Sequence, residues 1–421
     1  MAWSPCGRYV LFDYSQDRRE LSRNVVVVDL HAARFHVLPE YVSASRLKYP
    51  EVFTKTEGGE AVAYKFSGNP QAEALFDDLA RRSAVAGDPR IEHLSRIELV
   101  WPRLARGELG LKGVDELIER SLGIFEADDD FARGRAWHCR AVVDAVYRFR
   151  HGELEAMVKR VQAHYERAGV ARGGALFLLA AAAYRGPMPA QEGIDRCSAL
   201  LDDAGTPFWQ SFILPMLAVL EAMDGQIDAA RAHLVDARLA RQEFPEGGAL
   251  ATSWAALAAE VELLAGDLER AESILTAACD SLRAVGEREW LATNSALLAE
   301  VLYRQGRFQE ALQQSGEALG FAPPGHLTSL AVARRVRAKA LAQAGELVEA
   351  ISLASETITL LRETQVLDEQ GEAYAALAEV QALAGFATDA EEAWDRALGF
   401  FERKGNRVSE ARIRSMNLSR R

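Results

Sequence analysis

A short pattern led by glycine recurs through the second half of this 421-residue chain. In each copy an apolar residue follows the glycine by two positions and an alanine follows it by five, as in Gly306, Phe308 and Ala311. Glycine permits the left-handed turn that ends one helix before the next begins. One pair of helices cannot bury both of its faces, so recurring pairs have to stack on one another. The glycines are Gly225, Gly266, Gly306, Gly345 and Gly385, at spacings of 41, 40, 39 and 40 residues.

Alanine holds a second fixed position, seven residues before the glycine of each copy. Small side chains let two helices approach closely while larger neighbours fill the remaining space. Two earlier glycines extend the series: Gly152 keeps the register, whereas Gly186 fits it poorly. We therefore expect antiparallel helix pairs that turn near Gly152 and near each of the five later glycines. The alternative is a generic alanine-rich helical bundle. The six alanines are Ala145, Ala218, Ala259, Ala299, Ala338 and Ala378.

The glycine-led turn resembles the central part of the tetratricopeptide motif, with Phe308 and Ala311 at its aromatic and alanine positions. The period near 40 exceeds the usual 34 residues, so longer helices are expected. The chain is 49% hydrophobic and 26% charged, a balance that supports a packed core. The fold class that we predict is mainly α. It is a tetratricopeptide-like α-solenoid of about seven or eight helix pairs over residues 71–421, preceded by a small N-terminal β segment over residues 1–70.

The first 70 residues carry a different pattern, in which short runs of β-branched and aromatic residues are separated by turn signals. Such runs cover residues 8–12, 24–29 and 34–38, and two further runs flank a Gly-Gly hairpin signal at residues 58–59. Residues 3–8 with residues 27–30 resemble one blade of the WD40-like propellers of TolB-type proteins. A propeller needs about four or more blades to close. The segment is therefore either part of a longer propeller or a small sheet that caps the solenoid.

Three stretches resemble the C-terminal repeat region of large bacterial signalling proteins. In those proteins a class III adenylate/guanylate cyclase domain and an ATPase domain precede tetratricopeptide repeats, and related regions occur in ATPase-type transcription regulators. The resemblance covers about residues 88–418 and implies a regulatory or scaffolding arm, with a cyclase or ATPase domain encoded nearby or upstream. It does not imply cyclase activity, because the chain has no room for that domain. The stretches are Gly186–Cys197, Val261–Asp267 and Phe401–Asn406.

Sequence signatures of catalysis are missing: GxxxxGK[ST], HExxH and GxSxG do not occur. The acidic run at residues 128–130 lacks the alternating ligands of an EF-hand, and acids are favoured at a helix N-terminus. Cys139 follows His138, but adjacent residues on a helix do not face each other, so we interpret Cys139 as a core thiol. We therefore predict a non-enzymatic protein with no catalytic residue, no cofactor and no metal.

The net charge and the cysteines limit which classes of partner and which cellular compartment are expected. A net charge of −12 disfavours nucleic acid and anionic membranes as general partners. The basic tail from Phe401 could contact phosphate, but we interpret it as a solvated last helix. The four cysteines form no CxxC pair, and no secretory signal is present. The longest apolar run has ten residues, against the ~20 that a membrane span needs. These features predict a cytoplasmic protein.

Charged residues recur six positions before four of the turn glycines, which predicts a ladder on the inner, concave face of the solenoid. One interpretation is a polar groove for a protein or peptide partner. The other is that Glu300, Lys339 and Glu379 pair with one another across neighbouring repeats. The function that we predict is an interaction or regulatory scaffold module of a bacterial signalling system. The alternative is a small-ligand or peptide sensor arm of an ATPase-type transcription regulator. The candidate groove residues are Glu260, Glu300, Tyr303, Arg335, Lys339 and Glu379.

Overall fold

The computed structural model describes the helical part of the chain almost throughout. The described residues are 2–3, 9–14, 24–29, 34–38, 52–53, 62–63, 70–168, 173–204, 207–242 and 249–418. Among them, residues 2–38 contribute four antiparallel strands in the order β1-β2-β3-β4, and β5 pairs with β6. The other residues before residue 70 lie outside the described residues, so the propeller-like fold of residues 1–70 stays a prediction. The strands are β1 (Ala2–Trp3), β2 (Tyr9–Tyr14), β3 (Asn24–Asp29), β4 (Arg34–Leu38), β5 (Val52–Phe53) and β6 (Val62–Ala63).

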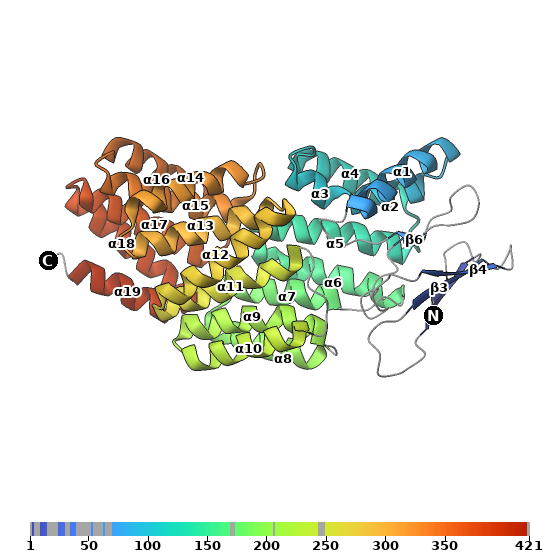
Figure 1. Cartoon of the computed structure of the whole chain (residues 1–421), viewed down its shortest axis with the longest axis horizontal. Coiled ribbons are helices and arrows are strands. Elements are labelled where there is room, and N and C mark those ends of the chain that lie inside the picture. Colours follow the sequence, from blue (N-terminus) through green and yellow to red (C-terminus); the bar gives the residue numbers. More distant parts are fainter. Residues whose placement is uncertain are drawn as a thin grey trace. The chain divides into compact units, whose positions relative to one another are not determined.

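Helices account for nearly all of the described residues after residue 69 (Figure 1). The first six are α1 (Pro70–Ala86), α2 (Pro89–Glu98), α3 (Val100–Ala105), α4 (Leu111–Ile124), α5 (Asp130–Val146) and α6 (His151–Arg167). The next six are α7 (Gly173–Arg185), α8 (Ala190–Asp203), α9 (Pro207–Asp224), α10 (Ile227–Gln242), α11 (Ala249–Ala265) and α12 (Leu268–Val285). The last seven are α13 (Glu289–Arg304), α14 (Phe308–Phe321), α15 (Leu327–Gln343), α16 (Leu347–Leu361), α17 (Leu367–Leu383), α18 (Ala387–Lys404) and α19 (Arg407–Leu418).

The five later glycines lie in the turns where the sequence pattern predicts them, each with a positive φ. Gly306 has φ 79° between α13 and α14. Its amide donates to the Tyr303 carbonyl at 2.9 Å, and the Arg307 amide donates to the Leu302 carbonyl at 2.9 Å. These two bonds supply hydrogen-bond donors to carbonyls at the end of α13, which have no donor within the helix itself. The prediction of helix pairs joined at these glycines is confirmed.

The turn between α5 and α6 departs from the repeat. It spans residues 147–150, and its left-handed residue is Phe149, with φ 52°. Gly152 lies inside the first turn of α6 instead. A Cβ at Gly152 would lie 2.0 Å from Oε1 of Gln365, the end of a flexible and exposed side chain that would have to move aside. The turn therefore lies close to Gly152, as predicted, but its left-handed residue is Phe149 rather than the glycine.

The repeated alanines are buried in the helix pairs. Each of the six is at most 3% exposed, and Ala299 is fully buried. The Gly345 copy has Thr357 where other copies have a late alanine. Thr357 is nevertheless fully buried, because its hydroxyl donates to the Leu353 carbonyl at 2.8 Å. A satisfied hydroxyl makes a small polar side chain acceptable at a tightly packed position.

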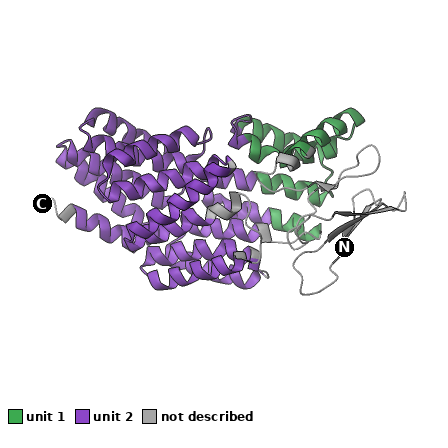
Figure 2. Cartoon of the chain, viewed as in Figure 1, with its two compact units in different colours: residues 1–103, 112–139, 161–172 green, residues 104–111, 140–160, 173–421 purple. Residues whose placement is uncertain are grey.

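The chain divides into two compact units (Figure 2). Unit 1 comprises residues 1–103, 112–139 and 161–172, and unit 2 comprises residues 104–111, 140–160 and 173–421. The predicted boundary near residue 70 falls within unit 1 and stays a prediction. In unit 1, Phe76 and Leu79 of α1 pack against Leu99. Within the described residues, no helix is long and apolar enough to cross a membrane.

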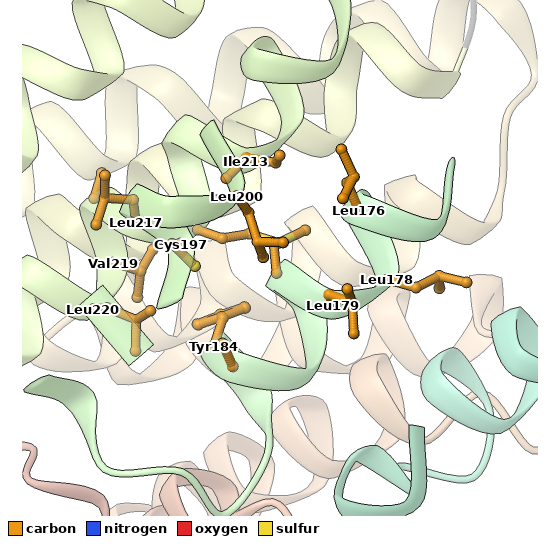
Figure 3. Packing of buried hydrophobic residues seen from close by; sticks show 14 of the residues in the cluster. Leu176, Leu178, Leu179, Tyr184, Cys197, Leu200, Ile213, Leu217, Val219 and Leu220 are labelled. Atoms are coloured by element: carbon orange, nitrogen blue, oxygen red, sulfur yellow. The ribbon is translucent and has the colours of Figure 1, made fainter. Parts of the chain in front are cut away.

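One large part of the unit 2 core lies between α7, α8 and α9 (Figure 3). Tyr184 of α7, Cys197 and Leu200 of α8 and Ile213 of α9 gather near the centre of this cluster. Each of these side chains is at most 5% exposed. Burial of side chains of this size stabilises a fold by ~1.5–3 kcal/mol each. Successive pairs continue the stack, so the core runs along unit 2 as a series of clusters.

Candidate functional site

The inner face of unit 2 is formed by the first helix of each pair. The helices α7, α9, α11, α13, α15 and α17 contact one another in this order. Together with α19 they line a partly open cavity of about 60 Å³, which has room for a few water molecules. We call the charged side chains that line it the inner cluster. Its members are Arg185, Glu260, Glu300, Arg304, Arg335, Asp368, Glu369 and Glu372.

Glu300 is the most deeply buried carboxylate of the inner cluster, with 1% exposure. Its oxygens accept from Nζ of Lys339 at 2.9 and 3.0 Å and from Nε of Arg304 at 2.8 Å. Burial alone would raise the pKa of Glu300, but the cations Lys339, Arg304 and Arg335 hold it well below its usual value. The Lys339 ammonium also lies 4.4 Å from the centre of the Tyr303 ring. Glu300 is therefore ionised and doubly paired.

A tyrosine reaches a glutamate two repeats further along the chain at two equivalent positions. The Tyr303 hydroxyl donates to Glu379 and accepts from Gln343 at 3.3 Å. The Tyr184 hydroxyl donates to Glu260 in the same way. Burial raises the pKa of Tyr303, and the Glu379 charge raises it further, so the hydroxyl keeps its proton. The spacing of 76 residues in both pairs shows that the same contact recurs along the inner face.

Arg185 of α7 and Arg335 of α15 both pair with Glu369 of α17. Arg335 donates to Glu369 in a buried ion pair. Arg185 donates to Glu369 at 3.3 Å and to Glu260 at 3.2 Å. Burial raises the pKa of Glu260, and Arg185 and the Tyr184 hydroxyl offset part of that shift. These contacts join α7 to α17, which are separated by four helix pairs, so the stack is cross-linked through its inner face.

Lys404, at the end of α18, is wholly buried. Its Nζ donates to the carbonyls of Ala183, Gly186 and Met188 at 3.2, 3.0 and 2.9 Å. A cation beside the carbonyls that end a helix is favourable. Lys404 belongs to Phe401–Asn406, and its acceptors include the start of Gly186–Cys197. Two of the three stretches that carry the family resemblance therefore meet in space.

Asp368 lies beside this junction in the wall of the cavity. Its Oδ1 accepts from Nδ2 of Asn406 at 2.6 Å. Burial and the nearby Glu372 charge raise the pKa of Asp368 to about 7. Asp368 is therefore the cluster member whose charge changes near neutral pH.

The structure brings most of the predicted groove residues to one face, but buries them more deeply than an open groove requires. Glu300, Tyr303, Arg335 and Lys339 are at most 7% exposed, and Glu260 and Glu379 are half-buried. The pairing of Glu300 with Lys339, which was the alternative to a groove, is present. Whether these residues bind a partner stays a prediction. The sequence analysis missed Arg185, Asp368, Glu369 and Lys404, although the resemblance to Gly186–Cys197 and Phe401–Asn406 marked two of the segments involved.

The acidic run and Cys139 lie in unit 1. Asp129 accepts from the Ala132 amide at 3.2 Å and so caps α5, and it pairs with Arg90. Asp130 pairs with Arg167 at 2.8 Å. These contacts agree with the interpretation as a helix N-terminus. Cys139 is half-buried and not a fully buried core thiol as predicted. No group of three potential metal ligands occurs among the described residues.

Comparison with known proteins shows the fold of this chain. In sequence, the chain matches no protein-family model and no curated protein. Its structure is similar to that of a Rap protein complexed with Competence and Sporulation Factor, with a TM-score of 0.60 and 14% identity over 81% of this chain and 93% of that chain. It is also similar to the APC/C hetero-tetramer Cut9–Hcn1, with a TM-score of 0.54 and 13% identity over 81% of this chain and 60% of that chain. Such identities show a shared fold alone. The helical part is a tetratricopeptide-like α-solenoid, as predicted.

Proposed function

We propose that this chain is a non-enzymatic protein-interaction or regulatory scaffold module, and that its partner is a protein or peptide bound at the inner face of unit 2. The observation that carries this proposal is the inner cluster. Buried ion pairs are often no more stabilising than apolar residues of the same size. Stability alone therefore does not explain why charged side chains from several helix pairs converge on one cavity. Recognition of a charged partner does explain it.

The partner would bind by replacing two hydrogen bonds of the inner face. Glu260 and Glu379 are half-buried, and each accepts a tyrosine hydroxyl. A cationic or hydrogen-bonding group of a peptide could replace that hydroxyl without leaving a buried charge unpaired. Glu300, Arg335 and Lys339 would then hold the deeper end of the groove. The similar Rap and Cut9 structures are both complexes, with Competence and Sporulation Factor and with Hcn1, which supports a partner of this class.

The biological setting that we propose is a bacterial, cytoplasmic signalling system. The family resemblance supports a cyclase or ATPase domain encoded nearby or upstream as the part that this module regulates. The net charge of −12 argues against nucleic acid and membrane as partners. Residues 1–70 would form a small β segment with propeller-like blades, and residues 71–421 would form the solenoid domain.

A second candidate function is a sensor for a small charged ligand. Arg335 lines the cavity, and within the described residues its buried Nε has no hydrogen-bond partner. A small anion could accept from that group if the inner cluster opened around it. A metabolite panel tests this candidate by thermal unfolding, because a ligand of the native state raises the unfolding temperature. Stabilisation that disappears in Arg335→Lys would favour it.

The interaction module is tested with peptides selected from a random displayed library on the full chain. Affinity is then measured for the wild type, for Glu379→Gln on the inner face and for Glu349→Gln, an exposed position on α16. We expect Glu379→Gln to weaken binding about tenfold, because one hydrogen bond to a charged group contributes ~1.5–3 kcal/mol. Glu349→Gln should leave binding unchanged. Equal affinity for all three proteins would rule out the inner face as the site.

A further inference from the structure

The turn between α5 and α6 packs against helices far along the chain. We call residues 147–151 the docked turn; they belong to unit 2 (Figure 2). Phe149 is fully buried against Ala331 of α15, Leu361 of α16 and Ala373 of α17, together with Val366. In an open solenoid each helix pair contacts only its neighbours. The docked turn is therefore an additional contact, which ordinary stacking does not require.

We call the apolar residues that bury Phe149, namely Ala331, Leu361, Val366 and Ala373, the socket. Polar groups from the start of α13, from the residue before α15 and from the turn before α17 lie around it. The backbone amide of Gln365 donates to the backbone carbonyl of Phe149 at 3.4 Å. The Tyr147 hydroxyl donates to Glu289 at 3.4 Å, and its ring lies edge-on to His326 with centroids 5.3 Å apart. The Phe149 ring thus lies among apolar residues of the socket, and the Tyr147 ring, two residues earlier in the chain, lies among polar groups at its edge.

The socket adjoins the inner cluster through Arg185. Its guanidinium lies 6.0 Å from the centre of the Phe149 ring and pairs with Glu369 and Glu260. An aromatic face attracts a cation at this distance. Whatever fills the socket therefore contacts the same arginine that links α7 to α17.

The docked turn is an imperfect occupant. Phe149 is the one non-glycine residue with a positive φ among the described residues. A left-handed backbone is unfavourable for a side chain of this size. His151 is buried, and within the described residues neither of its ring nitrogens has a hydrogen-bond partner. Such costs persist only where the surrounding structure enforces them, and they concentrate at ligand clamps and switches.

We propose that the socket of Ala331, Leu361, Val366 and Ala373 is a binding site for a phenylalanine-bearing turn of a protein partner, and that Phe149 fills it within the chain until the partner arrives. This inference rests on the proposed function as an interaction module. A partner turn with tyrosine two residues before phenylalanine reproduces both ring contacts. It need not adopt the left-handed backbone or bury a histidine, so it competes with the docked turn.

The experiment uses a fluorescently labelled peptide of residues 143–155, which contains the docked turn, as the probe. Binding is measured by anisotropy to the full-length wild type and to full-length Phe149→Gly. Glycine removes the ring and accepts the positive φ, so the turn keeps its backbone while the socket empties. We expect the peptide to bind Phe149→Gly at least about tenfold more tightly than the wild type. The same peptide with alanine at position 149 should lose that gain.

Phe401→Ala is the matched control, because Phe401 is also fully buried in unit 2 but lies in a separate cluster. It should bind the peptide as weakly as the wild type does. If Phe149→Gly does not fold, hydrogen exchange on the wild type replaces it. Saturating peptide should then raise exchange across residues 147–155 and leave the Gly385 turn unchanged.

Three results would overturn the inference. The first is a peptide that binds neither Phe149→Gly nor the wild type, with no change in exchange. The second is equal binding to Phe149→Gly and Phe401→Ala. The third is a wild-type dimer that Phe149→Gly converts to a monomer, because a second copy would then supply the ring. Library peptides that still depended on Glu379 would leave the proposed function standing in each case, so the two failures are distinguishable.

Discussion

The Glu300 pairs allow an asymmetric prediction about stability. Glu300→Gln removes the carboxylate that Lys339 and Arg304 share and leaves two cations in a buried site. Lys339→Met leaves Glu300 paired with Arg304 at 2.8 Å, and methionine refills most of the volume. Breaking a buried ion pair and leaving a charge behind costs ~3–5 kcal/mol. Losing hydrogen bonds while the remaining charge keeps a partner costs ~1–3 kcal/mol. Glu300→Gln should therefore be the more destabilising change by about 2 kcal/mol.

Chemical denaturation at neutral pH measures this difference in the free energy of unfolding. A repeat array can unfold in parts, so hydrogen exchange in α13 and α15 has to accompany the global probe. Both variants should raise exchange in these two helices before the ends of unit 2 respond. Glu349→Gln, a surface change of the same chemistry, should stay within about 0.5 kcal/mol of the wild type.

The opposite order would refute the reasoning. If Lys339→Met cost as much as Glu300→Gln, Arg304 alone would not satisfy the carboxylate, and the two cations would not act as alternatives. A second check is the pH dependence. The folded-state pKa of Glu300 is depressed, so its contribution to stability is present above the unfolded pKa and is lost as the pH falls through the folded value. Glu300→Gln should remove that part of the acid sensitivity.

Two further predictions concern the buried alanine of the repeat, Ala299, and the titration of Asp368. Replacing the fully buried Ala299 with Trp should cost ~1–3 kcal/mol and raise hydrogen exchange first around residues 287–320, whereas Gln313→Trp at an exposed position should be nearly neutral. The pKa of Asp368 is raised to about 7, so its contribution to stability is lost as the pH rises through that value. The free energy of unfolding of the wild type should therefore fall by about 1 kcal/mol between about pH 6 and pH 8. In Asp368→Asn, urea titrations over the same range should show a free energy of unfolding that changes less with pH.

The helix pairs could be predicted from the sequence because their determinants are local. A left-handed glycine ends one helix, an alanine seven residues earlier allows the close approach, and both recur at one spacing. Ala299 and Gly306 therefore have the environments that the pattern indicates, with full burial and φ 79°. The same counting brought Glu300 and Lys339 to one face, because positions equivalent in the repeat point in equivalent directions.

The partners of the inner cluster could not be predicted in the same way. Arg185 meets residues 75 and 184 positions later in the chain, and Lys404 meets a carbonyl 221 positions earlier. Such contacts depend on how far each helix pair rotates relative to the previous one. Small rotations accumulate over several pairs, and no local pattern records their sum. The sequence could indicate which face is charged and, as one alternative, that Glu300 and Lys339 of neighbouring repeats pair, but not which distant helices Arg185 and Lys404 would reach.

The α5–α6 turn shows how a failed local rule can locate a functional contact. The repeat register assigns the left-handed turn to Gly152, yet the residue with the positive φ is Phe149. Gly152 lies inside the first turn of α6, where the end of the exposed Gln365 side chain approaches it. Phe149 tolerates its backbone because its ring is fully buried in a distant socket. The departure at Phe149 is explained by the docking of this turn onto Ala331, Leu361 and Ala373. Where local preference and structure disagree for a single nonlocal reason, that contact is the one whose release would let the chain respond to a partner.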